Sequence, residues 1–375
     1  MVHGANPYGV LPPVPGLSFA NVFSNNNTAT IAYLPFWPFL TGLIYLAYSL
    51  AGWNDRFFYY FLLKQPIILA DVALAYLLYS FVRARKPDKA AARWALGFWL
   101  FAPFTIMISG IWGMFDSIAI CLVFLSIAST NRVKGSFWEG LAIFTKTLPI
   151  IYAVPLTVKR FRDLWTAILS ISLAALLSLI TFDLMEWPIR VVAITVASSA
   201  FKGGWSMSAW DVLFYMYYLG SLPNPNSKIY EAFGLLWIPA LAAFTWIGIK
   251  RFRNQAEYGL IQALLLCTLA FLIFKARITE QYGLYLFALG VVDVTVWHPE
   301  RRQLLLVTMG VAMVYLALNN IFLVRFLSPV YPGFVELERG IDAAFGPIRL
   351  ALLTATGIVF TCLNVKYLAE VLKRR

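Results

Sequence analysis

The 375-residue chain is 61% hydrophobic and only 13% charged, and its mean hydropathy is +0.73. A soluble domain carries about 45–50% apolar and about 25% charged residues, so this composition excludes a soluble protein and predicts one embedded in membrane lipids. The formal net charge of +12 would suit a nucleic-acid partner. However, the basic residues lie in short loops beside apolar segments and not on a soluble surface, so no nucleic acid is expected.

The basic residues predict how the chain is oriented. Most of the 30 Lys and Arg residues fall in short clusters just beyond hydrophobic segments. The clusters are Arg83 to Arg93, Arg132 with Lys134, Lys159 to Arg162, Lys250 to Arg253, Arg301 with Arg302, and Lys366 to Arg375. Loops rich in Lys and Arg remain cytoplasmic when a membrane protein inserts. We therefore expect an integral membrane protein, in the cell membrane if the organism is prokaryotic, with a cytoplasmic C-terminus.

The expected fold class is all-α, a polytopic transmembrane helical bundle with broken or re-entrant half-helices and extracytoplasmic loops. Residues 1–30, rich in Pro, Gly and Asn, predict an extracytoplasmic N-terminal loop, and residues 31–375 a single transmembrane domain. The expected helices are 31–52, 66–82, 95–110, 117–129, 138–157, 163–182, 229–249, 256–274, 282–297, 303–324 and 347–369. The expected external segments are 110–116, 183–228, 275–281 and 325–346.

The orientation of the first two predicted helices is inconsistent. A span over 31–52 that begins outside ends inside, whereas 66–82 has to begin outside to reach the basic cluster after it. Either the aromatic stretch 57–63 forms a re-entrant excursion, or one of the spans is misassigned.

Two segments are predicted to be broken. The segment 138–157 has basic clusters on both sides and carries Lys146 and Pro149 near its middle. It therefore predicts a re-entrant pair of half-helices, which membranes tolerate where protein or a cavity covers the freed backbone. The stretch 95–129 predicts two short helices that turn at 110–113.

Charged residues and helix breakers meet apolar segments at four places, and an ionisable group at membrane depth is a functional candidate. These places are Lys64-Gln65-Pro66 with Asp71, Trp112 to Ser117, Thr145 to Pro149, and Lys275 to Tyr282. The cations able to neutralise a phosphate are Lys64, Lys146, Lys275 and Arg277. The carboxylates able to accept a proton from a hydroxyl are Asp116 and Glu280. Trp112, Phe115 and Tyr282 offer flat faces for a sugar ring or a lipid chain.

Each of these groups also has an interpretation without chemistry. Lys64 and Asp71 could pair within the bundle, and Lys146 could extend to the interface. The segments 112–117 and 275–282 could be ordinary turns. The prediction of a site for a phosphorylated amphiphile therefore depends on the groups converging on one side of the membrane.

Several short motifs occur in a recognisable order over roughly residues 5–290. They are Asn6-Pro7-Tyr8, Tyr33-Leu34-Pro35, Gly113-Met114-Phe115-Asp116-Ser117 after Pro103, Lys146-Thr147-Leu148-Pro149, and Lys275 followed by Gln281-Tyr282. In this order the sequence resembles the membrane glycosyltransferases of the GT-C fold that use polyprenyl-phosphate sugars. The closest resemblance is to mannosyltransferases of the PIG-M type and related prokaryotic families.

The resemblance implies that a hexose, mannose in those families, passes from a polyprenyl- or dolichyl-phosphate donor to a hydroxyl acceptor on a glycan, glycolipid or protein. Transfer would take place on the extracytoplasmic side with inversion. In our mechanism hypothesis Lys275 or Arg277 holds the donor phosphate, Asp116 orients the acceptor hydroxyl, and Glu280 or an upstream Asp removes its proton. The remaining candidate substrate-binding residues are Lys64, Trp112, Lys146, Gln281 and Tyr282. No cofactor is expected, because a lipid monophosphate leaves without help; a divalent metal on Asp116 is compatible but not required.

The sequence departs from this family at its start. The expected base in the family is a carboxylate in the first external loop, which follows a first transmembrane helix. This chain begins at the Asn-Pro-Tyr end of that loop and has no acidic residue before Asp55. Either the start is clipped or another carboxylate serves. An inactive, N-terminally truncated GT-C protein and a lipid-linked sugar flippase or transporter are the alternatives, although no inverted repeat supports a transporter.

Overall fold

The computed structural model describes residues 34–157, 163–187, 189, 206–218, 234–252, 255–321, 323–324, 331 and 333–373. The predicted N-terminal loop 1–30, the motif residue Tyr33 and most of the predicted connection 183–228 lie outside these ranges. Within them every regular element is a helix, which confirms the all-α prediction.

The helices in chain order are α2 (Phe36–Leu50), α3 (Arg56–Arg83), α4 (Lys89–Phe101), α5 (Pro103–Thr105), η1 (Ile106–Trp112), α6 (Asp116–Ala128), α7 (Arg132–Thr145), η2 (Leu148–Tyr152), α8 (Ala153–Leu156), α9 (Trp165–Leu184), α11 (Asp211–Tyr218), α13 (Trp237–Arg251), α14 (Ala256–Phe274), η4 (Glu280–Tyr282), α15 (Gly283–Val296), η5 (Pro299–Arg301), α16 (Arg302–Asn319) and α18 (Phe334–Leu372).

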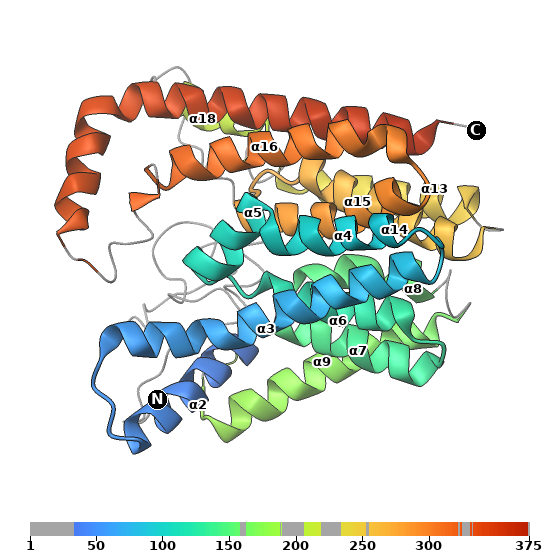
Figure 1. The fold of residues 1–375 in the computed structure, drawn as a ribbon, viewed down its shortest axis with the longest axis horizontal. Coiled ribbons are helices and arrows are strands. Elements are labelled where there is room, and N and C mark those ends of the chain that lie inside the picture. Colours follow the sequence, from blue (N-terminus) through green and yellow to red (C-terminus); the bar gives the residue numbers. More distant parts are fainter. Residues whose placement is uncertain are drawn as a thin grey trace, which may run out of the picture.

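Six stretches of helix are long and apolar enough to cross a membrane by length and composition. They lie in α3, α4 through η1, α9, α14, η5 with α16, and α18. The long helices run side by side along the length of the molecule (Figure 1). Apolar residues occupy every face of α14 and α15, which is the pattern of a helix buried in the middle of a bundle. All residues of α15 from Gly283 to Thr295 are buried accordingly.

The basic clusters within the described ranges gather at one end of the bundle, here called the basic end. Arg85 at the end of α3 pairs with Glu257 at the start of α14, at 2.5 Å. Arg251 at the end of α13 donates to the carbonyl of Leu372 at the end of α18, at 2.5 Å. This convergence is what the positive-inside pattern requires of loops on one side of a membrane. The assignment of the basic end to the cytoplasm stays a prediction.

The segment after α7 turns back toward the end from which it came. Arg132 at the start of α7 lies 3.9 Å from Asp163, which precedes α9. Thr157 after α8 shares a 3.1 Å hydrogen bond with Thr166 in the first turn of α9. The chain therefore leaves the basic end in α7 and returns toward it after α8, while the re-entrant placement of this segment in a membrane stays a prediction.

The first two predicted membrane helices need correction. A helix of 15 residues reaches about 22 Å, short of the roughly 30 Å of a bilayer core, so α2 is not a full span. The predicted span 31–52 was therefore the misassigned one. The second helix begins at Arg56 and not at Pro66, because Asp55 caps it by accepting from the backbone N–H of Phe58 at 2.7 Å. The stretch 57–63 is thus the first part of α3 and not a separate excursion.

The last helix is longer than predicted. Residues 334–346, expected in an external loop, form the first third of α18, which continues through Pro347 to Leu372. Proline removes an intrahelical hydrogen bond and crowds the preceding turn, which gives a local cause for the bend of this helix in Figure 1. A sequence rule that ends helices at proline misses such a bent helix.

Candidate functional site

The centre of the candidate site is a buried ion pair between two helix breaks. Lys146 Nζ lies 2.6 Å from Asp116 Oδ2, and the exposed fractions of the two side chains are 3% and 0%. Lys146 follows the last residue of α7, where the ring of Pro149 would clash with the carbonyl of Thr145 in a continued helix. Asp116 is the first residue of α6, where a helix dipole favours a carboxylate. Proline and helix polarity thus bring the two charges together.

Aromatic rings surround the cation of this pair. Lys146 Nζ lies 4.6 Å from the centroid of the Phe115 ring and 6.0 Å from that of Tyr282. Trp37 of α2 stacks on Phe115, with centroids 4.6 Å apart and planes 11° apart. Such ring faces attract a cation and also suit the apolar face of a sugar.

The pair is not fully hydrogen-bonded by the part of the chain that the structure describes. There, Asp116 Oδ1 has no hydrogen-bond partner, and the same is true of Tyr285 Oη, Gln281 Oε1 and both carboxyl oxygens of Glu139. Tyr285 interacts electrostatically with Asp116 and Glu139, so these groups belong to one neighbourhood. The large majority of buried side-chain polar atoms in proteins are paired, which makes this concentration unusual.

Lys64 approaches the turn that precedes Asp116. Its Nζ donates to the carbonyl of Ile111 at 2.7 Å, and its stem lies 3.7 Å from where a side chain on Gly113 would begin. Gly113 has φ +82°, a left-handed conformation that favours glycine, and it ends η1. Asp71 accepts from Trp99 Nε1 at 3.0 Å. The alternative in which Lys64 pairs with Asp71 is therefore wrong, and Lys64 instead fixes the turn that carries half-buried Trp112.

The turn 275–282 supplies the outer part of the site. Lys275 is buried among Trp237 and Phe271, whose ring centroids lie 5.6 and 6.0 Å from its Nζ. Phe271 in turn makes an edge contact with Tyr282 at 5.4 Å, and this connects Lys275 to the Lys146 neighbourhood. Burial, and secondarily the charge of Arg277, lowers the pKa of Lys275 to about 8. Arg277 itself is exposed.

Glu280 is buried on the same turn and points toward a different helix. Its Oε1 accepts from Asn319 Nδ2, at the end of α16, at 2.5 Å. Gln281 next to it is 4% exposed. The two predicted catalytic carboxylates therefore have different hydrogen-bond partners, Lys146 for Asp116 and Asn319 for Glu280.

The segment 206–211 holds this turn against α18. The backbone N–H of Met207 donates to the carbonyl of Ile278, and the N–H of Ile278 donates to Ser206 Oγ, both at 2.8 Å. Ser208 packs so closely on Gly357 of α18 that a side chain there would meet the Ser208 carbonyl at 2.7 Å. Asp211 accepts from the N–H of Ser206 at 3.0 Å, and burial raises the pKa of Asp211 to about 6.

Of the nine predicted site residues, most converge at the end of the bundle opposite the basic end, here called the site end. Asp116, Lys146 and Tyr282 form the centre, Lys275 is joined to them through Phe271, and Lys64 and Trp112 belong to the adjoining turn. Arg277 is at the surface, and Glu280 with Gln281 lies toward α16. Asp116, Lys146 and Tyr282 therefore lie together and Arg277 lies apart at the surface, while their role as a substrate site stays a prediction.

Sequence reasoning missed Glu139, Tyr285 and Asn319. Glu139 carried a usable signal, because it is a lone carboxylate in an apolar helix, 2% exposed in the structure. Tyr285 and Asn319 carried none, since tyrosine and asparagine are common in membrane helices and only the fold brings them to Asp116 and Glu280.

Among the described residues no group of three or more His, Cys, Asp or Glu is arranged to hold a metal ion. Cys121 and Cys267 are buried in the core, whereas Cys362 is exposed. A cavity of about 820 Å³ lies elsewhere, at the basic end beyond the other terminus of α15. At 14 residues, α15 places about 21 Å between it and the candidate site.

Comparison with protein-family models and with curated proteins finds no match for this chain.

Proposed function

We propose that this protein is a membrane-embedded glycosyltransferase. It moves a hexose, with mannose as the first candidate, from a polyprenyl-phosphate donor to a hydroxyl acceptor on the extracytoplasmic side, with inversion. The motifs of its sequence suggest this chemistry, and the arrangement of the site end supports it.

The observation that carries the proposal is the buried Asp116–Lys146 pair with one carboxylate oxygen left over. Lys146 Nζ donates to Asp116 Oδ2, and Asp116 Oδ1 has no hydrogen-bond partner among the described residues. A carboxylate oxygen among aromatic rings is a suitable acceptor for a sugar hydroxyl.

Exposure increases along the site in the direction from which a lipid-borne substrate would come. Asp116 and Lys146 are buried, Trp112 and Tyr282 are half-buried, and Arg277 is exposed. In the proposed arrangement the donor phosphate meets Lys275 and Arg277 at the outer turn, and the acceptor hydroxyl reaches inward to Asp116. The cations then stabilise the charge that develops on the departing phosphate.

The proposed reaction is one displacement. Asp116 orients the acceptor hydroxyl, and Glu280 accepts its proton as the hydroxyl oxygen attacks the anomeric carbon from the face opposite the phosphate. The bond between the anomeric carbon and the phosphate oxygen breaks, and the polyprenyl phosphate leaves with the electron pair. Asn319 holds Glu280 in place through its 2.5 Å hydrogen bond.

The test is transfer by the purified protein from radiolabelled polyprenyl-phosphate mannose to a panel of hydroxyl acceptors. We expect a new glycosidic product from the wild type and its loss from Asp116→Asn and from Lys275→Ala. Full activity in both variants contradicts the proposal. Movement of the labelled donor across vesicle membranes without a new glycosidic bond would instead identify a transporter.

A further inference from the structure

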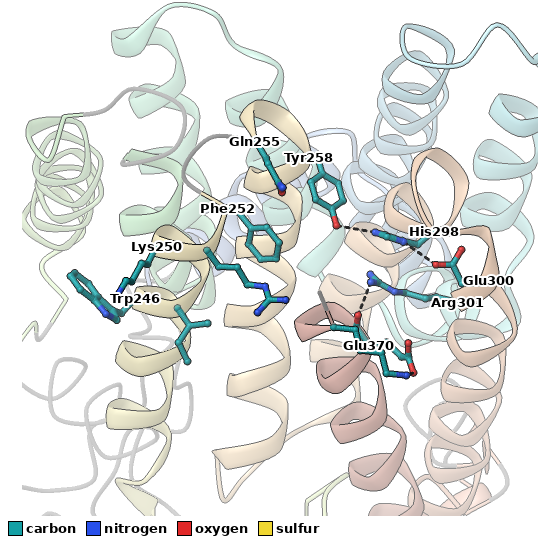
Figure 2. A pocket seen from close by; sticks show the side chains of 12 residues that line it. Trp246, Lys250, Phe252, Gln255, Tyr258, His298, Glu300, Arg301 and Glu370 are labelled. Carbon is teal, nitrogen blue, oxygen red and sulfur yellow. Dashed lines mark hydrogen bonds and ion pairs between the residues drawn. The ribbon is translucent and has the colours of Figure 1, made fainter. Parts of the chain in front are cut away.

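The basic end carries a second, separate feature: a cavity of about 820 Å³ bounded by α13, α14, the end of α18 and the turn before α16. Figure 2 shows Trp246 and Lys250 of α13 on one side of it and His298, Glu300 and Arg301 on the other. No step of the proposed glycosyl transfer uses it.

Most charges on the cavity wall are matched within the protein. Arg301 pairs with buried Asp293 at 3.0 Å, Lys373 pairs with Glu370, and His298 Nδ1 lies 3.0 Å from Glu300 Oε1. Tyr258 Oη shares a 3.0 Å hydrogen bond with the other nitrogen of His298 (Figure 2). These contacts form a fixed wall and leave it close to neutral on that side.

The opposite wall carries unmatched positive charge. Lys250 and Arg251 end α13 and line the cavity, and neither has a carboxylate within ion-pair distance in the described ranges. Arg251 Nη2 donates to the carbonyl of Leu372, which holds the guanidinium in place without neutralising it. The cavity therefore presents two positive charges on a wall made rigid by α18.

The same wall has an apolar side that faces outward. Trp246 lies one helical turn before Lys250 on α13, so the two side chains are neighbours, and 66% of Trp246 is exposed. Tryptophan is enriched where a membrane meets water, because its ring is apolar and its N–H is polar. A ligand bound here meets two cations at one end and an indole face at the other.

We propose that this cavity binds the phosphate headgroup of an anionic phospholipid. The phosphate contacts Lys250 and Arg251, and the part of the acyl chain nearest the headgroup runs along Trp246. Basic pockets between membrane helices bind anionic headgroups in this way. A neutral headgroup leaves the two charges unmatched, so selectivity for anionic over zwitterionic lipid follows from the same arrangement.

The test measures lipid retention by native mass spectrometry on purified protein titrated with phosphatidylglycerol or phosphatidylcholine in 0.15 M salt, a concentration that screens exposed charges beyond about 8 Å. We expect preferential retention of phosphatidylglycerol by the wild type. Lys250→Gln should weaken it about fivefold, and Lys250→Gln with Arg251→Gln about thirtyfold.

The matched control is Arg132→Gln with Lys134→Gln, which removes two exposed cations from the same end of the bundle but outside the cavity. It should change lipid retention less than twofold. An equal loss of retention in both double variants overturns the proposal, as does equal retention of the two lipids.

Inorganic phosphate is the third competitor tested. If millimolar phosphate competes and the protein shows no preference between the lipids, the cavity binds a free anion and the lipid proposal is overturned. Lys250 has no ion pair within the described part of the chain, so its single variant remains a valid test where Arg251→Gln fails to fold.

Discussion

A buried aspartate paired with a buried cation lies near each end of α15, and the two pairs differ in how completely they are hydrogen-bonded. At the basic end, Asp293 Oδ1 accepts from Gln262 at 2.6 Å, and Oδ2 accepts from Arg301 and Tyr367, each at 3.0 Å. At the site end, Asp116 Oδ2 accepts from Lys146, while Oδ1 has no partner among the described residues.

This difference separates a structural role from a binding role. A buried charge is tolerated when its lone pairs and protons are all engaged, and the Asp293 network meets that condition. A buried carboxylate oxygen without a partner costs about 1–3 kcal/mol or more, so a protein that keeps one leaves room for a ligand to supply the missing donor. The Asp116 pair is the one we expect a substrate to complete.

The largest expected effect is on transfer by Asp116→Asn, which should lower kcat by about 100- to 10,000-fold, the range that a positioned carboxylate contributes. Loss of folding could imitate that result, because the variant leaves Lys146 buried without its partner. The variant Asp116→Asn with Lys146→Met removes both charges, so it should recover thermal stability while remaining inactive. Recovery of activity along with stability would show that the pair only supports the fold.

The converse change is Asp293→Asn at the basic end. It leaves Arg301 without its carboxylate, so the free energy of unfolding should fall by about 3–5 kcal/mol. The kcat of the fraction that remains folded should stay within about threefold of the wild type, because Asp293 is separated from the site by the length of α15. Denaturant titration measures the free energy of unfolding, and activity per folded molecule measures kcat. A hundredfold loss of kcat in fully folded protein would contradict the proposed difference between the two ends.

The sequence predicted the buried central helices and the helix breaks well, because both depend on local signals. An apolar stretch such as 256–274 becomes a helix wherever it is buried, and Pro149 interrupts α7 through its own ring. The starts of α3 at Arg56 and of α18 at Phe334 were missed, because Pro66 and Pro347 are accommodated inside these helices by their surroundings.

The pairing of side chains across the fold was only partly predictable. Charge and proline marked Asp116 and Lys146 as unusual, but not as partners, because 30 residues separate them. The partner of Glu280 is 39 residues away on α16, and no periodic pattern connects the two. Which oxygen remains unpartnered is a property of packing alone, so the contrast between Asp116 and Asp293 could not be derived from the sequence.

Glu280→Gln sharpens the division of roles within the site end. Glutamine keeps a side-chain oxygen to accept from Asn319 but accepts no proton, so kcat should fall about a hundredfold, the lower end of what a general base contributes, with little change in the donor KM. Asn319→Leu serves as the companion variant, since it retains the carboxylate and removes only its 2.5 Å hydrogen bond. Its kcat should fall less than that of Glu280→Gln; the reverse order would assign Glu280 to the fold and not to proton transfer.

A pH titration tests Lys275 as a phosphate ligand. Burial lowers its pKa to about 8, so its charge is present below that pH and is lost as the pH rises through it. Donor KM should therefore rise about tenfold between pH 7 and pH 9, as the protonated fraction falls tenfold. Lys275→Arg should show a flat profile over this range, because guanidinium stays charged. An unchanged slope in Lys275→Arg would place the titrating group elsewhere.

The smallest effect is expected for Arg277→Gln, at the outermost point of the site end. Arg277 is exposed, and interactions between exposed charges are weak in water, so donor KM should rise less than threefold at 0.15 M salt. The effect should grow at 0.02 M salt, where screening extends over a longer distance, while kcat stays constant. Removing Arg277 also removes a repulsive charge near Lys275, so the pH at which donor binding weakens should move upward in the same variant. A loss of activity as large as that of Asp116→Asn would mean that the turn 275–282 closes over the substrate and buries Arg277. The difference to explain would then be between an open and a closed state of the site end, and not between the two ends of the bundle.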